Sequence, residues 1–195
     1  MAEKAPVYCT WSYRSLLPPD IRSQFRDLDQ FVRSLCSSAT EQIVMVAPYL
    51  SVMGMKSLRA SLATSAQRGA WIRLLTSNLK EARGWNRKAI TALVEDDDGA
   101  LVRSRLRILA PTENLPALIH AKIILTDHRR GYLGSANLSR SAMDLNLEVG
   151  LSLAPAQVGA LESLISLLEA QNFVVDYTAT VLGKVDNAIR MRDKQ

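Results

Sequence analysis

Apolar residues in the first half of the chain alternate between helical stripes and short continuous runs. A stripe after Pro18 and Pro19 predicts a helix that Asp20 caps, with inward positions at Ile21, Phe25, Leu28, Val32 and Leu35. Continuous runs at 43–48 and 71–76 predict buried strands. Helices are predicted over 54–67 and 80–95, and the second of these ends in an acidic turn at 96–99.

The second half of the chain is richer in predicted strands, at 105–109, 119–126, 131–135 and 147–153. A helix should follow Pro155, with apolar positions at Val158, Leu161, Leu164, Ile165 and Leu168. Several strands are apolar on both faces, which is typical of a sheet that helices cover from both sides. The pattern therefore predicts one α/β domain, a mixed β-sheet flanked by helices on both faces.

Length, apolar content, cysteine number and net charge indicate which class of protein the chain belongs to. A chain of 195 residues is long enough for one well-buried domain. No apolar run approaches the ~18 residues that span a bilayer, and the first 20 residues lack a signal-peptide core. We therefore expect a cytoplasmic protein without stable membrane association.

Cys9 and Cys36 are too few for a disulfide framework and should be reduced. The net charge of +5 is compatible with a polyanionic partner but is weak evidence alone.

The candidate chemistry lies in one string, in which His120, Lys122 and Asp127 have the spacing His-x-Lys-x4-Asp and Gly134-Ser135-Ala136-Asn137 follows. In a strand, His120 and Lys122 share one face roughly 7 Å apart. Such a pair suits an anionic group, because the lysine neutralises phosphoryl oxygens while the imidazole attacks phosphorus or moves a proton. The opposite face would pack through Ile119, Ala121, Ile123 and Leu125.

The neighbouring residues have separate expected roles. The amide of Asn137 can donate to a phosphoryl oxygen, and Gly134 and Ser135 let the backbone approach a ligand closely. Asp127 is out of phase with His120, so we expect it to fix the hairpin turn through backbone hydrogen bonds rather than to touch substrate. His128 lacks a Lys or Asn partner at motif spacing and is expected to be a surface turn residue.

These residues resemble the HKD motif of the phospholipase D superfamily, and the resemblance covers roughly residues 43–153. Asn146-Leu147-Glu148 is similar to an Asn-x-Glu of that family, which implies that Glu148 holds the histidine through its second ring nitrogen. The family's mechanism implies attack of one histidine on phosphorus, a phosphohistidine intermediate, and protonation of the leaving oxygen by a second histidine. It implies no metal and no other cofactor.

Enzymes of that superfamily build one active site from two motifs, whereas this chain has two histidines in all and one motif. We therefore predict a homodimer with its active site at the twofold interface. Within each chain we expect a catalytic domain over 41–170. Residues 1–40 should form an N-terminal segment and helix packed on that domain, and 171–195 a C-terminal extension with a polar tail from Lys184.

Three substrate hypotheses follow. Stand-alone single-motif members resemble bacterial endonucleases and restriction-type nucleases, some of them in phage-defence modules, so a nuclease acting on DNA or RNA comes first. A phospholipid-hydrolysing or phosphatidyl-transferring enzyme is the alternative, and an inactive nucleic-acid-binding dimeric scaffold is the third. Arginines on one strand face and at a hairpin tip could contact a nucleic-acid backbone or simply be solvated: Arg103, Arg105, Arg107, Arg129 and Arg130.

Overall fold

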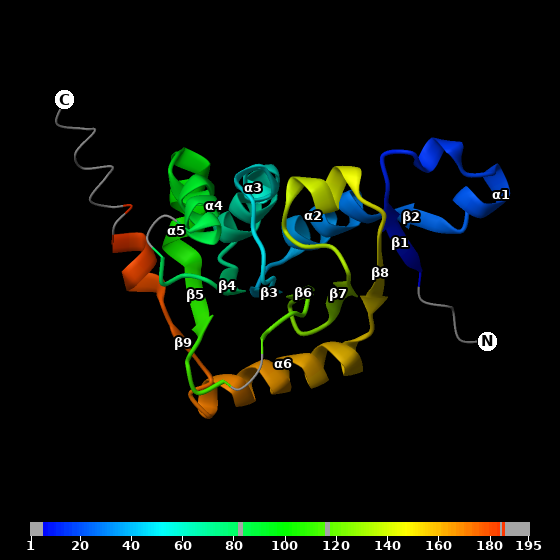
Figure 1. The fold of residues 1–195 in the computed structure, drawn as a ribbon. Coiled ribbons are helices and arrows are strands. Elements are labelled where there is room, and N and C mark those ends of the chain that lie inside the picture. Colours follow the sequence, from blue (N-terminus) through cyan, green and yellow to red (C-terminus); the bar gives the residue numbers. More distant parts are fainter. Residues whose placement is uncertain (1–5, 82–83, 116–117, 184, 186–195) are drawn as a thin grey trace.

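A computed structural model describes residues 6–81, 84–115, 118–183 and 185 of the chain. A nine-stranded sheet forms its centre (Figure 1), in the order β2-β1-β8-β7-β6-β3-β4-β5-β9. The strands are β1 (Val7–Thr10), β2 (Phe25–Asp27), β3 (Gln42–Val46), β4 (Trp71–Leu75), β5 (Leu106–Pro111), β6 (Ile123–Thr126), β7 (Arg130–Gly134), β8 (Glu148–Leu153) and β9 (Val174–Asp176).

The helices are α1 (Pro19–Arg22), α2 (Leu28–Ser38), α3 (Val52–Gln67), α4 (Trp85–Val94), α5 (Asp97–Arg105) and α6 (Pro155–Ala170), with short turns η1 (Arg14–Leu16) and η2 (Ser141–Leu145). Residues 178–183 are also helical. Strands β3, β4 and β5 are parallel because helices connect them, whereas β3, β6, β7, β8 and β1 pair antiparallel in that order. The sheet is therefore mixed, as predicted.

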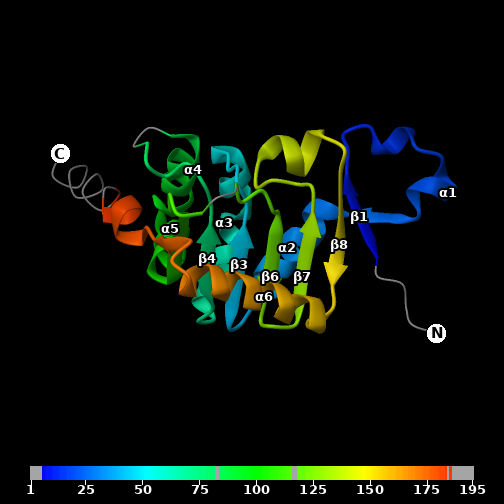
Figure 2. The same ribbon diagram turned by 60° about the horizontal axis from the view of Figure 1, so that its bottom comes forward.

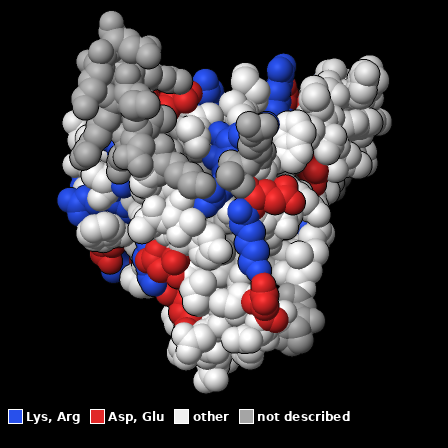
Figure 3. Space-filling model, turned by 60° about the vertical axis from the view of Figure 1, so that its left-hand side comes forward, with Lys and Arg blue, Asp and Glu red and all other residues white. Residues whose placement is uncertain are grey.

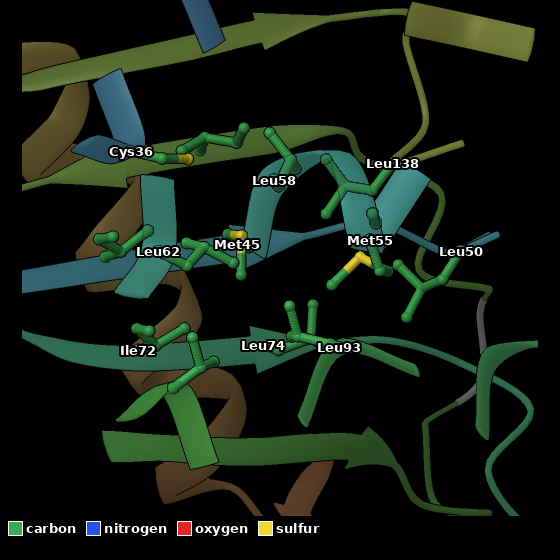
Figure 4. Packing of buried hydrophobic residues seen from close by; sticks show 14 of the residues in the cluster. Cys36, Met45, Leu50, Met55, Leu58, Leu62, Ile72, Leu74, Leu93 and Leu138 are labelled. Atoms are coloured by element: carbon green, nitrogen blue, oxygen red, sulfur yellow. The ribbon is translucent and has the colours of Figure 1, made fainter. Parts of the chain in front are cut away.

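Helices cover both faces of this sheet (Figures 1 and 2). Helices α2 to α5 lie on one face, where Met45 and Leu74 of the strands pack against Leu58 and Leu62 of α3 (Figure 4). Helix α6 runs across the other face and covers a second buried cluster that includes Val44, Val46, Leu75, Leu109, Ile123 and Leu125. The α/β fold with helices on both faces is confirmed.

The first predicted helix is wrong in its extent, because two short helices and a strand replace it. Phe25–Asp27 pairs with β1 in parallel, and this interrupts the helical stripe. Asp27, not Asp20, caps α2 by accepting a hydrogen bond from the backbone N–H of Gln30 at 2.8 Å. The apolar spacing continues across the break, so periodicity alone could not reveal a strand that forms only through its partner.

The predicted acidic turn at 96–99 is instead the beginning of α5. Asp96 caps this helix, because its carboxylate accepts from the backbone N–H of Gly99 at 2.9 Å. Arg103 and Arg105 consequently lie in the last turn of α5, and only Arg107 lies in β5. The expected alternation of three arginines on one strand face is therefore wrong. The preceding helix, predicted over 80–95, begins at Trp85.

The sheet extends across both of the expected domain boundaries. Strands β1 and β2 precede residue 41, and β9 follows residue 170. The predicted polar tail lies almost wholly outside the described residues. Cys9 and Cys36 are both buried and free of disulfides, and burial raises the pKa of the Cys36 thiol to about 12. None of the described helices has the length and apolar character needed to cross a membrane.

Candidate active site

The predicted site residues gather where strands of opposite direction meet. Strands β3, β4 and β7 end at the same end of the sheet (Figure 2), and the antiparallel strands β6 and β8 begin there. We call this the motif end of the sheet. His120 and Lys122 immediately precede β6, Asn137 follows β7, and Glu148 begins β8. The topology thus brings together four residues that are spread over 29 positions of sequence.

Strand β6 begins at Ile123 rather than at 119, so His120 and Lys122 lie in the segment before it. The predicted alternation nevertheless holds. Ile119 and Ala121 pack with the buried cluster beneath α6, to which Ile123 also belongs. The backbone N–H of Gly134 donates to the carbonyl of Lys122 at 3.2 Å and fixes this segment beside the end of β7. His120 and Lys122 therefore share the other side.

The two motif side chains are in contact. The ammonium of Lys122 lies 3.0 Å from Nδ1 and 3.1 Å from Nε2 of His120, and it donates to the His120 carbonyl at 2.8 Å. One ammonium cannot donate in the ring plane to two divergent nitrogens, so Nζ lies against the ring. Burial lowers the pKa of Lys122, and the nearby charge of Glu148 opposes this. The buried ammonium of Lys122 thus lies directly against the exposed imidazole of His120.

The turn that carries Asn137 is built on Tyr132, which is 1% exposed. The Tyr132 hydroxyl accepts from the backbone N–H of Ala136 at 3.2 Å and holds the turn against the sheet. A Cβ at Gly134 would collide with that hydroxyl and would lie 2.6 Å from the carbonyl oxygen of Val149, so only glycine fits there. Within the described residues, Oδ1 of Asn137 is buried without a hydrogen-bond partner. This unpaired oxygen can accept a hydrogen bond from a donor group of a ligand.

Glu148 is held by residues other than the histidine. The hydroxyl of Ser135 donates to one of its oxygens, and Nδ2 of Asn146 donates to the other at 3.4 Å. No hydrogen bond joins Glu148 to His120 among the residues described. The role implied for Glu148 by the family resemblance therefore stays a prediction, whereas its electrostatic effect on Lys122 follows from the geometry.

Asp127 and His128 lie at the opposite end of β6, roughly 23–26 Å along the chain from His120 at ~3.3 Å per residue. The Asp127 carboxylate accepts from the backbone N–H groups of Thr40, Glu41 and Gln42 at 2.9, 2.8 and 3.0 Å. Burial would raise the pKa of Asp127, but these hydrogen bonds outweigh it and hold the pKa below its usual value. The bonds go to the chain entering β3 rather than to the hairpin itself. His128 is exposed, with Nδ1 2.8 Å from Glu162.

The arginines considered for nucleic-acid contact also lie away from the motif end. Arg107 is paired with Asp176 at 2.9 Å and Glu169 at 2.8 Å, and Arg105 lies over the ring of Trp71. Figure 3 shows acidic and basic side chains interspersed on this side of the molecule, rather than one continuous basic track. Arg129 and Arg130 flank the hairpin at the far end of β6. The structure does not bring these four arginines to His120.

Asn86 is a buried residue at the motif end that the sequence did not reveal. Its side chain accepts from the backbone N–H of Leu50 at 2.9 Å and donates to the carbonyls of Pro48 and Ser77, both at 2.8 Å. Asn86 thereby ties the loop after β3 to the loop after β4. The first of these loops carries Tyr49, whose ring meets that of His120 edge-on with centroids 6.4 Å apart. A lone Asn near a helix start carries no sequence signal for such a role.

Comparison with known proteins identifies the family and the fold of the chain. The family described as "Cardiolipin synthase, PLD-like domain" matches residues 32–163, more than half of the chain. No curated protein has a matching sequence. In the described part of the chain, no group of three or more His, Cys, Asp or Glu side chains could hold a metal ion.

Solved structures share the fold at low sequence identity. The phospholipase D family member Nuc from Salmonella typhimurium superposes with a TM-score of 0.61 at 18% identity, covering 89% of this chain and 99% of Nuc. NucT from Helicobacter pylori superposes with a TM-score of 0.55 at 16% sequence identity, covering 75% of this chain and 89% of NucT. Phosphatidylserine synthase from Haemophilus influenzae superposes with a TM-score of 0.53 at 15% sequence identity, covering 86% of this chain but 41% of the synthase.

Proposed function

Because the chain belongs to the phospholipase D superfamily through its PLD-like domain, we propose that it is a metal-independent nuclease that cleaves phosphodiester bonds through His120. The observation that carries the proposal is the set of side chains at the motif end. An exposed imidazole, a buried ammonium in contact with it and the half-buried side chain of Asn137 all lie at the motif end of the sheet. Together they supply a nucleophile, a cation for phosphoryl oxygens and, through Nδ2 of Asn137, an amide donor for them.

The proposed reaction has two steps. A ring nitrogen of His120 attacks phosphorus, an N–P bond forms, and the P–O bond to the leaving group breaks. A second histidine gives its proton to the leaving oxygen, which otherwise departs as a poorly stabilised alkoxide. Water then attacks phosphorus, the same second histidine takes its proton, and the N–P bond breaks. Lys122 and Asn137 stabilise charge on the phosphoryl oxygens in both steps.

The second histidine is proposed to come from a second copy of the chain. His128 cannot serve within one chain, because it lies at the opposite end of β6 and is paired with Glu162. A twofold axis at the motif end would place two copies of His120 face to face in one site. Exposed apolar side chains surround this end, namely Tyr49, Leu118 and Leu147 at 50%, 66% and 63% exposure. Such side chains are suited to burial in an interface.

Nucleic acid is the proposed substrate for two reasons. The net charge of +5 favours a polyanion. In addition, the chain covers nearly all of Nuc and NucT but less than half of phosphatidylserine synthase, so its size matches the compact relatives. A phospholipid-directed activity, which the family's description and the synthase would favour, is the alternative. A catalytically inactive, nucleic-acid-binding dimer is the third.

Incubation with labelled DNA and RNA, single-stranded and duplex, in excess EDTA tests the proposal. We expect chelator-resistant cleavage that His120→Ala abolishes and that the matched variant His128→Ala retains. Quenching in alkaline denaturant during turnover, which preserves an acid-labile phosphohistidine, should trap label on wild-type protein when the label is on the fragment that keeps the scissile phosphate, and not on His120→Ala. Release of a phospholipid head group without nucleic-acid cleavage would favour the alternative. Binding without cleavage of either substrate would favour the scaffold.

A further inference from the structure

A cavity of about 350 Å³ lies beside the motif at the same end of the sheet. Ser77 and Asn78, which follow β4, form one wall, and Thr112, which follows β5, forms another. Leu118 and Ile119 line the cavity directly before His120 in the chain. Its volume falls within the range of small-ligand sites, roughly 300–1,000 Å³. The mechanism proposed above makes no use of this space.

One residue of the cavity wall carries a polar group that lacks a partner. Ser77 is only 5% exposed, and among the described residues its hydroxyl has no hydrogen-bond partner. Buried hydroxyls are nearly always paired, so an unpaired one in a cavity wall indicates a ligand that completes it. Thr112, by contrast, already donates to the carbonyl of Asn172 at 2.9 Å. The remaining lining combines apolar side chains with Asn78, the charged residues Lys80 and Glu81, and Tyr177.

The walls are fixed before any ligand enters. Asn86 donates to the carbonyl of Ser77 at 2.8 Å, and Thr112 is anchored by its bond to Asn172. The backbone N–H of Tyr177 donates to the carbonyl of Ile108 at 2.8 Å and holds that residue beside β5. A preformed site loses less free energy on ordering when it binds, which favours a specific ligand.

The cavity adjoins the motif along the chain. Consecutive Cα atoms are about 3.8 Å apart, so the wall formed by Leu118 and Ile119 leads directly to His120. Side chains alternate along this segment, with Ile119 and Ala121 under α6 and His120 on the other side. The same alternation carried one residue further places Leu118 on the His120 side. A substrate whose phosphate reaches His120 would therefore have its adjoining group at the cavity.

We propose that this cavity receives one unpaired nucleobase next to the scissile phosphate, so that the protein acts on single-stranded nucleic acid. The inference rests on the nuclease function proposed above. A base has a flat ring that can stack on Tyr177 and a polar edge that can pair with the Ser77 hydroxyl. An acyl chain would leave that hydroxyl unpaired. A base in a duplex would first have to leave the stack, at a cost of a few kcal/mol.

Binding and cleavage measurements separate this inference from the function on which it rests. The binding assay uses His120→Ala protein in EDTA with a fluorescent single-stranded DNA hexamer, its fully abasic counterpart of equal charge, and the duplex. We expect the hexamer to bind at least tenfold more tightly than the abasic strand or the duplex. Adding Ser77→Ala should reduce hexamer affinity about three- to tenfold, as expected for one lost hydrogen bond, and leave abasic binding unchanged.

The exposed Ser163 of α6 supplies a matched control, because Ser163→Ala removes a hydroxyl far from the cavity. Circular dichroism establishes that each variant is folded. Equal affinity for the intact and abasic strands, or a base-dependent affinity that Ser77→Ala leaves intact, would overturn the cavity assignment. Cleavage of duplex and single strands at equal rates would also overturn it while the nuclease proposal stands. Absence of cleavage of any nucleic acid would instead remove the proposed function.

Discussion

His120 and Asp127, the first and last residues of the motif, lie at opposite ends of β6. His120 precedes the strand at the motif end, whereas Asp127 follows it and accepts hydrogen bonds from the backbone of Glu41 and Gln42 as the chain enters β3. The one motif therefore contains a chemical part and a structural part. Asp127 holds β6 beside β3, and this pairing sets the position at which His120 emerges from the sheet.

Asp127→Asn should lower stability while leaving the chemical step intact in molecules that fold. Losing hydrogen bonds to a charged acceptor should cost about 1.5–3 kcal/mol of unfolding free energy at neutral pH. The folded-state pKa of Asp127 is lowered, so its contribution is present above the unfolded pKa of about 3.9 and is lost as pH falls through the folded pKa. Urea unfolding at several pH values measures the difference between wild type and variant.

Asp20 provides the control for that measurement, because its side chain is exposed and caps no helix. Asp20→Asn should leave the unfolding free energy unchanged within about 0.5 kcal/mol. A difference between wild type and Asp127→Asn that stayed constant down to pH values below both pKa values would contradict the assignment of this charge to folding stability.

Lys122→Met should reduce kcat by roughly 10²-fold or more, because methionine keeps the buried stem but removes the charge beside the reacting phosphoryl group. The dependence of wild-type activity on pH should also reflect the titration of this lysine. Its pKa is lowered by burial, so the ammonium loses its proton below the ordinary lysine pKa of about 10.4. We expect kcat/KM to decrease as the pH rises, and the decrease should begin below this ordinary lysine pKa. A Lys122→Met enzyme with unchanged kcat would exclude the lysine from transition-state stabilisation.

The sequence predicted those features that depend on local patterning. Alternation from Ile119 to Leu125 correctly separated the packed side from the side of His120 and Lys122, although β6 begins only at Ile123. The split of the first helix was missed, because β2 is a strand only by pairing with β1. Asn86 was missed for a similar reason, since its partners Pro48, Leu50 and Ser77 come from two loops that the sheet brings together. Long-range pairing leaves no periodic trace in sequence.

Mixing active and inactive subunits tests the proposed shared site. If one dimer uses both copies of His120, exchange of wild type with an equal amount of His120→Ala chain leaves about a quarter of the dimers fully wild type. Activity per total chain should then fall to about a quarter of the wild-type value, compared with about half for independent sites. Single-turnover cleavage after subunit exchange is the measurement. A value of one half, or full activity in a protein shown to be monomeric by light scattering, would contradict the shared site.

Lys80, which lines the cavity beside the motif, forms an exposed ion pair with Glu113, the residue after Thr112 of the opposite wall. The hydrogen bond and charge of Glu113 raise the pKa of Lys80, and those of Lys80 lower the pKa of Glu113. Exposed pairs contribute little to folding, so Glu113→Gln should leave the melting temperature nearly unchanged. The substitution also frees an ammonium and removes a negative charge where a phosphate backbone would pass.

We therefore expect Glu113→Gln to bind the single-stranded DNA hexamer several-fold more tightly at low salt, with the gain disappearing at high salt. A plot of log affinity against log salt concentration should steepen by about 0.7, the value for one additional phosphate contact on a single strand. Lys80→Gln should weaken binding, because it removes the cation and leaves Glu113 unpaired beside the polyanion. If Glu113→Gln leaves the salt slope unchanged, nucleic acid does not pass over this rim, because a freed lysine beside a bound strand would necessarily displace a counterion.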